Sequence, residues 1–266
     1  MTTIRSTLAT AVPTALREAI DGLLLSMADD EFVIGFSDSE WTGIAPILEE
    51  DVAMSSLAQD ELGHATALYE LLAALRDAPG VDADAIAYDR EPHEYRHARL
   101  LDHGRGDWAM TIARRYLYDT ADAVRLEALA ASSIAPLREL VDKIRREERY
   151  HLMHATAWLE RLAERRGEPR DRLVAAMEEL GPDAGTVFTP LAGEAKLVEG
   201  GALAEPMEAL EARWRARITP DFVRLGLPMP PATADAINGR VIHGEPFRWL
   251  WSEFTSVRLQ DPVAAW

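Results

Sequence analysis

Two short segments of this chain share a pattern that restricts its fold more than any other feature. Residues 60–64 read Asp-Glu-Leu-Gly-His and residues 147–151 read Glu-Glu-Arg-Tyr-His, so each places a His three positions after a Glu. Residues three apart on an α-helix share a face, so each segment can direct a carboxylate and an imidazole at one point. Helix bundles that bind two metal ions use Glu-x-x-His on two helices and one further carboxylate on each of the other two. The duplication therefore predicts a four-helix bundle with a dinuclear metal site.

Four long segments have the apolar periodicity of amphipathic helices. Proline near the start and glycine or proline after the end support several of their boundaries. The polar segment 81–106 is long enough to cross between distant helix ends and to contain one short helix. The four long helices are predicted at about 13–38, 47–77, 107–131 and 136–166.

Acidic and imidazole groups interrupt the apolar face of each predicted helix. Burying an unpaired carboxylate is costly, so a carboxylate on such a face is expected to be paired or bound to a metal. Several anions in one core would repel each other unless cations neutralised them. Oxygen and imidazole ligands in this geometry suit iron, and manganese less well. We predict two iron ions held by six residues: Glu31, Glu61, His64, Asp119, Glu148 and His151.

The pattern fixes two of these ligands less closely than the others. Asp29 and Asp30 flank Glu31, so a shift of one position stays open. Asp122 lies about one helical turn after Asp119 and is an alternative to it.

Other polar residues lie beside the predicted ligands. Asp60 is placed to accept the outer N–H of His151, and Glu147 that of His64, which would fix the orientation of both rings. Three further residues are expected outside the ligand set, on the surface, beside the ligands or in packing: His154, Tyr116 and Tyr118.

The spacing of the carboxylates is nearly the same in the two halves of the predicted bundle. Glu31 lies 30 residues before Glu61, and Asp119 lies 29 residues before Glu148. Each half is therefore a helical hairpin with one carboxylate on its first helix and Glu-x-x-His on its second. Two such hairpins predict an all-α, ferritin-like four-helix bundle over about residues 13–166.

The remaining segment, 167–266, is less regular and has too few apolar stripes for a core of its own. We expect it to be a helical extension that packs on the bundle or on another subunit, within a single domain of residues 1–266. Its predicted helices are 169–180, 206–218 and 247–258, with a loop at 220–231. Its tryptophans are Trp214, Trp249, Trp251 and Trp266.

Composition narrows the classes of function. The formal net charge of −17 argues against nucleic-acid binding, which needs a basic surface. The chain has no cysteine, so disulfides and metal–thiolate sites are excluded. The sequence contains no run of about 18 apolar residues, so no membrane span is predicted. The first ten residues lack the pattern of a secretory signal. A cytoplasmic location is expected.

An anionic ligand would need a local basic patch on so acidic a chain. Arg114 with Arg115, or the group Arg145, Arg146 and Arg149, could supply one. For each arginine alone, a solvated helix face with intrahelical ion pairs is the expectation.

Several segments resemble the ferritin-like subunits of bacterial ring 1,2-phenylacetyl-CoA epoxidase. The resemblance spans most of the chain and is closest to the C-type, or structural, subunit. It rests on Asp29-Asp30, Ser39-Glu40-Trp41, Ala45-Pro46, Leu48-Glu49, Asp51-Val52-Ala53, Ile112-Ala113-Arg114, Tyr116, Asp119, Glu148-Arg149-Tyr150-His151-Leu152, Gly239-Arg240, His243, Glu253, Pro262 and Trp266.

The resemblance implies a place in an oxygen-dependent complex. In this family an A-type subunit carries the di-iron chemistry, the C-type subunit pairs with it as a scaffold, and a reductase subunit supplies electrons for epoxidising the aromatic ring of a CoA thioester. Familiar C-type subunits have lost the metal ligands. Here residues 59–64 are similar to the ligand motif of the A-type subunit, and the motif at 147–151 is also intact.

Two functions are therefore expected to compete. In the first, the chain is the C-type component of such an epoxidase, with its own catalytic activity left open. In the alternative, it is a stand-alone di-iron oxygenase or oxidase acting on an acyl-CoA or related aromatic substrate. An iron-storage bundle is disfavoured, because storage needs little beyond the four helices and this chain continues with the long segment 167–266. A homo- or hetero-oligomer is expected in either case.

Overall fold

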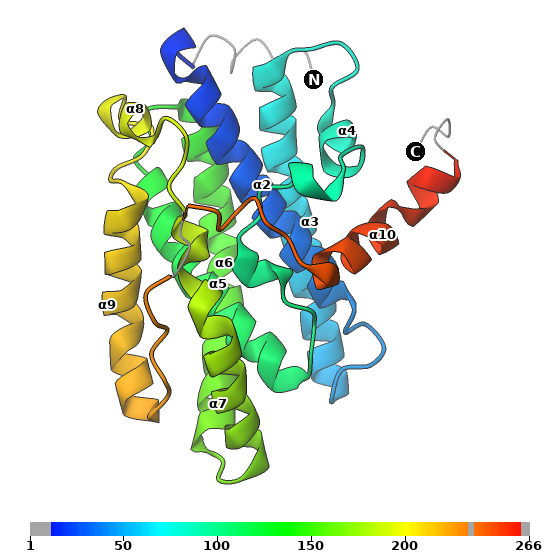
Figure 1. Cartoon of the computed structure of the whole chain (residues 1–266), viewed down its shortest axis with the longest axis vertical. Coiled ribbons are helices and arrows are strands. Elements are labelled where there is room, and N and C mark those ends of the chain that lie inside the picture. Colours follow the sequence, from blue (N-terminus) through cyan, green and yellow to red (C-terminus); the bar gives the residue numbers. More distant parts are fainter. Residues whose placement is uncertain (1–11, 234–236, 262–266) are drawn as a thin grey trace.

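The computed structural model of the chain describes residues 12–233 and 237–261. All regular secondary structure in these two ranges is helical (Figure 1). The sequence features noted in the first ten residues, and the resemblance at Pro262 and Trp266, lie outside the described residues. Every helix within the described ranges is too short or too polar to cross a lipid bilayer.

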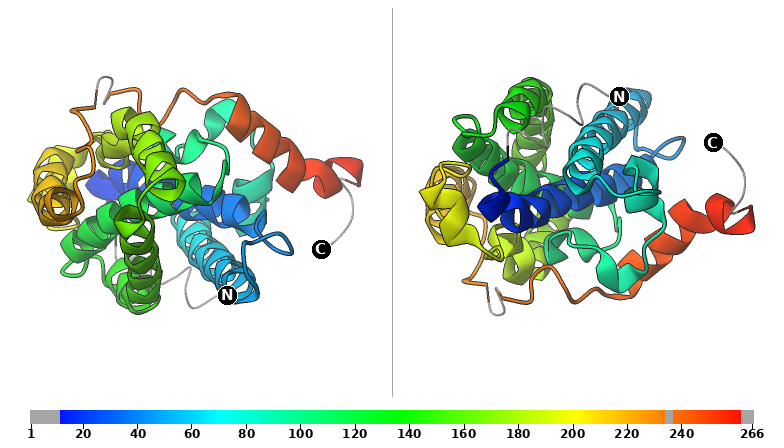
Figure 2. Two further views of the ribbon diagram at one scale, coloured as in Figure 1. Left: turned by 90° about the horizontal axis from the view of Figure 1, so that it is seen from below. Right: turned by 90° about the horizontal axis from the view of Figure 1, so that it is seen from above.

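Four long helices form a bundle of two hairpins, which Figure 2 shows end on. The helix α2 packs along α3, and α5 packs along α6. The ferritin-like fold is thereby confirmed, and each predicted helix end lies within about four residues of the observed one. The bundle helices are α2 (Arg17–Ser39), α3 (Leu48–Arg76), α5 (Trp108–Leu129) and α6 (Ala135–Glu164).

The connection between the two hairpins crosses the bundle as predicted. It contains the short helix α4 (Ala83–Tyr88) and the 3₁₀ turns η2 (Pro92–Glu94) and η3 (Arg99–Asp102). Together with the C-terminal segments it covers α2, which is buried over most of its length.

The C-terminal helices pack on the bundle. Trp214 is fully buried against α5, where its indole N–H donates to Thr120 Oγ1 at 2.9 Å. The elements are α7 (Glu168–Leu180), η4 (Gly181–Phe188), α8 (Glu194–Glu199), α9 (Met207–Leu225) and α10 (Glu245–Gln260).

The predicted end of α9 before Pro220 is wrong, because the helix continues to Leu225. The packing of the apolar face of the helix outweighs the loss of the one backbone hydrogen bond that proline cannot donate. Phe222 is buried and lies 6.0 Å from the ring of Tyr116, centroid to centroid. The helix ends instead at Gly226, whose φ of 61° closes it in the left-handed conformation.

Buried charged groups fasten the segment before α10 to the bundle. Arg240 donates from Nη1 and Nη2 to the two carboxylate oxygens of Asp30 on α2, at 2.8 and 2.9 Å. Asp102 accepts from His97 Nε2 at 2.5 Å and from His243 Nδ1 at 2.9 Å, and the two imidazole rings stack 4.0 Å apart. Burial acts to raise the pKa of Asp102, but the bonds from His243 and His97 outweigh it and hold that pKa well below its ordinary value.

This contact predicts a stability effect. We expect Asp102→Asn to lower the free energy of unfolding by about 3 kcal/mol at pH 7, since it removes the charge that both histidines contact. Because the folded pKa is depressed, the stabilisation is present above about pH 4 and is lost as the pH falls further. Urea unfolding at several pH values measures the difference between the variant and the wild type.

The matched control is Asp89→Asn, which removes an exposed ion pair to Arg258 on α10. It should cost no more than about 1 kcal/mol. Equal losses for the two variants would contradict the assignment of the buried carboxylate as the anchor.

Candidate metal centre

All six predicted ligands are buried inside the bundle. The helix α2 supplies Glu31, α3 supplies Glu61 and His64, α5 supplies Asp119, and α6 supplies Glu148 and His151. The 3.6-residue periodicity therefore brings together one group or one pair of groups from each helix at one level of the bundle.

The outer nitrogens of both histidines contact carboxylates on the opposite hairpin. His64 Nε2 donates to Glu147 Oε2 at 2.7 Å, and His151 Nε2 lies 3.4 Å from Asp60 Oδ2. These are the two pairs that the sequence pattern predicts. Since the outer nitrogens are engaged, Nδ1 of each ring faces the centre.

One half of the centre has the ligand atoms of a metal site close together. His64 Nδ1 lies 3.3 Å from Glu31 Oε2, 3.4 Å from Glu148 Oε1 and 3.8 Å from Glu61 Oε2. Each of these four residues offers an atom within 4.8 Å of the atoms of the other three. We call Glu31, Glu61, His64 and Glu148 the four-residue group.

The other half is arranged differently. His151 Nδ1 lies 3.0 Å from Glu148 Oε1 and 3.2 Å from Glu61 Oε1. Neither oxygen of Asp119 has a hydrogen-bond partner within the described ranges. His151 thus contacts two carboxylates of the four-residue group, whereas Asp119 forms no hydrogen bond with any of its members.

A fully buried guanidinium occupies this second half. Arg115 Nη1 lies 2.5 Å from Glu61 Oε1 and 3.2 Å from Asp38 Oδ2, and Arg115 Nε lies 3.4 Å from Asp119 Oδ1. The expectation of a solvated face is wrong for both Arg114 and Arg115, which are buried. The helical periodicity could have predicted the burial of Arg115, because Arg115 precedes Asp119 by four residues and so shares its inward face.

The acidic alternatives to the predicted ligands have arginine partners of their own. Asp29 accepts from Arg90 Nη2 at 2.5 Å. Asp30 and Asp122 each accept from Arg125, at 2.5 Å in both contacts. Glu31, and not Asp29 or Asp30, therefore faces the centre, and so does Asp119 in place of Asp122.

One aromatic residue contacts the centre although packing was expected for it. Tyr118 donates from its hydroxyl to Glu31 Oε1 at 3.0 Å, on the side away from His64. The hydroxyl of Tyr116 instead donates to Asp221, and His154 Nε2 pairs with Glu50 at 2.6 Å.

The pKa directions follow from an excess of buried negative charge. Burial raises the pKa of Glu31 and of Asp119 well above the ordinary carboxyl value, with further increases from Glu61 and Glu148 respectively. For His151, burial acts to lower the pKa, but attraction to Glu148 outweighs it and raises the pKa to about 11. Protons on these groups neutralise charge that a cation could neutralise instead.

The chemistry of the four-residue group fits a metal ion. Glu61 Oε2 and both oxygens of Glu148 are buried without a hydrogen-bond partner among the described residues. Leaving such atoms unpaired is costly, and a bound cation would remove that cost. Three carboxylates and one imidazole are the donors that iron and manganese accept.

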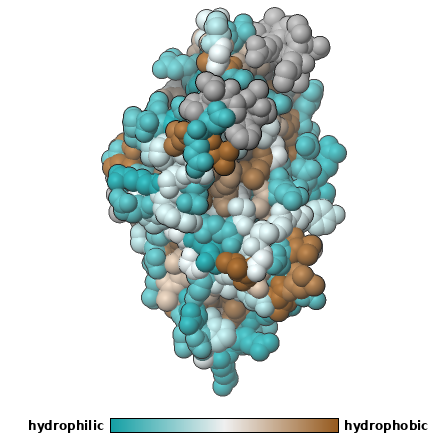
Figure 3. Space-filling model, turned by 90° about the vertical axis from the view of Figure 1, so that its right-hand side faces the viewer, coloured by the Kyte–Doolittle hydropathy of each residue, from teal (hydrophilic) through white to brown (hydrophobic). Residues whose placement is uncertain are grey.

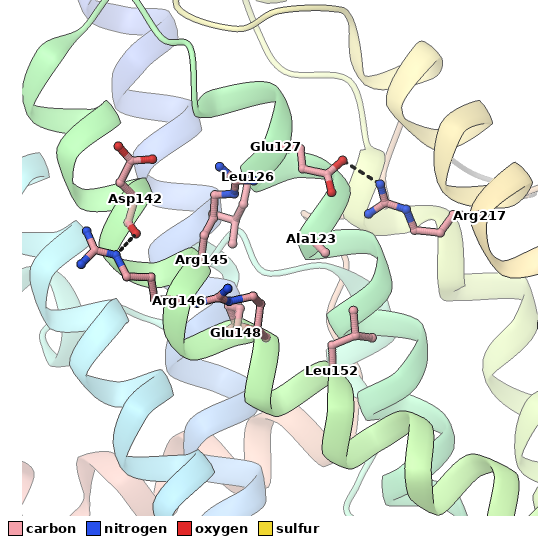
Figure 4. A pocket seen from close by; sticks show the side chains of 10 residues that line it. Ala123, Leu126, Glu127, Asp142, Arg145, Arg146, Glu148, Leu152 and Arg217 are labelled. Carbon is pink, nitrogen blue, oxygen red and sulfur yellow. Dashed lines mark hydrogen bonds and ion pairs between the residues drawn. The ribbon is translucent and has the colours of Figure 1, made fainter.

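A pocket of about 380 Å³ is lined by residues of α5, α6 and α9 (Figure 4). Glu148 lines it, together with the apolar side chains of Leu126 and Leu152. Arg145 and Arg149 also line it, and neither side chain forms an ion pair or hydrogen bond with another described residue. The pocket thus joins free positive charge to an apolar wall next to a candidate metal ligand.

Comparison with known proteins agrees with the resemblance seen in the sequence. A family model described as phenylacetic acid catabolic protein matches residues 1–266. The chain is also similar to the C-type subunit of the 1,2-phenylacetyl-CoA epoxidase of Escherichia coli (strain K12), with 27% identity over 243 residues, which are 91% of this chain and 97% of that protein. The chain belongs to the phenylacetic acid catabolic protein family.

Proposed function

We propose that this chain is the C-type component of a ring 1,2-phenylacetyl-CoA epoxidase in aerobic phenylacetate catabolism. It pairs with the catalytic ferritin-like subunit, and a reductase subunit supplies the electrons; the expected cytoplasmic location belongs to the same proposal. The similarity to the C-type subunit of the Escherichia coli enzyme, which extends over 97% of that protein, is the observation that carries this assignment.

An exposed apolar strip supports a protein partner. Leu48 and Val52 on α3, and Tyr150 and Met153 on α6, are all exposed. The contact between Glu50 and His154 places these two helix segments next to each other. Apolar patches interrupt the otherwise hydrophilic surface in Figure 3 as well. Clustered apolar side chains of this kind are typical of interfaces.

We also propose that the buried centre binds iron, with manganese as the less suited ion. Glu31, Glu61, His64 and Glu148 are the residues that would hold it. Iron in such a centre supplies oxygen activation, while the helices supply geometry and exclude water. In this chain Glu147 and Asp60 orient the histidines, and Tyr118 orients Glu31.

The pocket beside Glu148 favours a second candidate function. In that alternative the chain is itself an oxygenase or oxidase for an acyl-CoA or related aromatic substrate. Arg145 and Arg149 would bind phosphate groups, and the apolar wall would receive the acyl part. The two functions differ in whether turnover depends on the metal of this chain and in whether the isolated chain binds a CoA thioester.

Removing metal ligands should leave turnover by the complex intact. We expect the double variant Glu61→Gln and Glu148→Gln, paired with the catalytic subunit, to lose metal from this chain yet keep at least about half of the activity, because the chemistry lies in the partner. The matched control replaces the exposed Glu178 and Glu199 with Gln. A fall of about 100-fold in kcat, with pairing preserved on gel filtration, would establish the second function instead.

Metal uptake should strengthen as the pH rises. Burial acts to lower the pKa of His64, but hydrogen bonds to Glu148 and Glu31 outweigh it and raise that pKa far above its ordinary value, so a proton occupies this imidazole at neutral pH and has to leave when a cation binds there. We expect the affinity for Mn²⁺, followed by electron paramagnetic resonance, to rise roughly tenfold per pH unit for each proton displaced. An affinity that stays constant between pH 6 and 8 would contradict proton–metal competition.

Binding of a CoA thioester to the pocket can be measured directly. If the second function holds, Arg145→Glu with Arg149→Glu weakens binding of a non-reactive acyl-CoA at least about tenfold in calorimetry, since two charge-assisted contacts are reversed. The control replaces the exposed Arg165 and Arg166 with Glu. If the chain is the C-type component alone, the isolated wild type shows no binding to begin with.

A further inference from the structure

We propose that the centre of this chain takes up a single divalent metal ion, in the four-residue group, and that the guanidinium of Arg115 holds the place of the second ion. The inference rests on the proposed metal-binding function. It changes the expected number of metal ions per chain from two to one, and it names Arg115 as the cause.

The two oxygens of Glu61 face different neighbours. Its Oε2 lies on the side of His64, 3.8 Å from Nδ1. Its Oε1 lies 2.5 Å from Arg115 Nη1 and 3.2 Å from His151 Nδ1. Glu61 therefore has one oxygen directed at His64 and the other engaged by a guanidinium.

Arg115 also lies close to Asp119, the carboxylate outside the four-residue group. Its Nε lies 3.4 Å from Asp119 Oδ1, so the guanidinium links Glu61 to Asp119. The equivalent carboxylate of the first half, Glu31, directs Oε2 toward His64 instead of toward an arginine. The two halves thus have matching ligand types, but the arginine beside Glu31, Arg125, stays 3.9 Å from it.

The position of Arg115 is fixed by its surroundings. The side chain is fully buried, and Asp38 Oδ2 accepts from it at 3.2 Å. Arg114 holds the other oxygen of Asp38 at 3.4 Å and Ser37 Oγ at 2.7 Å. A guanidinium stays protonated at every accessible pH, so it remains a permanent positive charge beside Glu61 and Asp119.

Charge and space then decide the stoichiometry. A second divalent ion between Glu61, Asp119 and His151 would lie against a like charge that has no route to solvent. Beside Glu31 the nearby guanidinium is that of Arg125, whose Nη2 lies 3.9 Å from Oε1 of Glu31. This distance is longer than those from Arg115 to Glu61 and Asp119, so the positive charge opposes an ion less on this side. Binding is therefore expected in one half only.

The experiment loads the full-length protein with Mn²⁺ and measures metal per chain after gel filtration. We expect about one ion in the wild type and about two in Arg115→Met, with the spectrum of an isolated ion replaced by that of a coupled pair in electron paramagnetic resonance. The control Arg114→Met, which removes the neighbouring buried guanidinium, should stay at about one ion.

Two further variants keep the test valid if Arg115→Met does not fold. Glu31→Gln lies in the four-residue group and should weaken Mn²⁺ binding about 100-fold, whereas Asp119→Asn should change it less than about threefold. Equal effects of these two variants, or two ions in the wild type, would overturn the inference while leaving metal binding intact. No ion in the wild type or in any variant would instead remove the proposed metal-binding function itself.

Discussion

The interior of this bundle depends on the neutralisation of buried carboxylates. An isolated charge is far less stable in a protein core than in water, so each buried acid needs a partner. Asp30 has Arg125 and Arg240, and Glu61 has Arg115. Two carboxylates of the four-residue group, Glu61 and Glu148, retain atoms without a hydrogen-bond partner among the described residues. Burial and the neighbouring Glu61 raise the pKa of Glu31. The same requirement thus holds the fold together and leaves a place for a cation.

Helix periodicity and spacing predicted the bundle and the inward groups well. The two Glu-x-x-His segments are local patterns, so their geometry follows from the helix itself. The pairing of His64 with Glu147 and of His151 with Asp60 followed from the symmetry of the two hairpins. These features needed no knowledge of the tertiary contacts beyond the packing of four helices.

The parts that escaped prediction depend on contacts between distant segments. An arginine on a helix is predicted to be a surface residue until its partners are known, and Arg115 donates to Glu61 and Asp38, which lie 54 and 77 residues away. Pro220 reads as a helix end unless the packing of Phe222 on Tyr116 is known. Tyr118 reads as a packing residue because its acceptor, Glu31, is on another helix. In each of these three cases the prediction used the local sequence, whereas contacts with distant segments determine the outcome.

The proposed single-ion centre should differ visibly from a dinuclear one. An X-ray structure of the iron-loaded protein, with anomalous data collected at the iron edge, tests this most directly. We expect one anomalous peak among Glu31, Glu61, His64 and Glu148, with the Arg115 guanidinium still between Glu61 and Asp119. Two peaks, or a peak between Asp119 and His151, would contradict a single-ion centre.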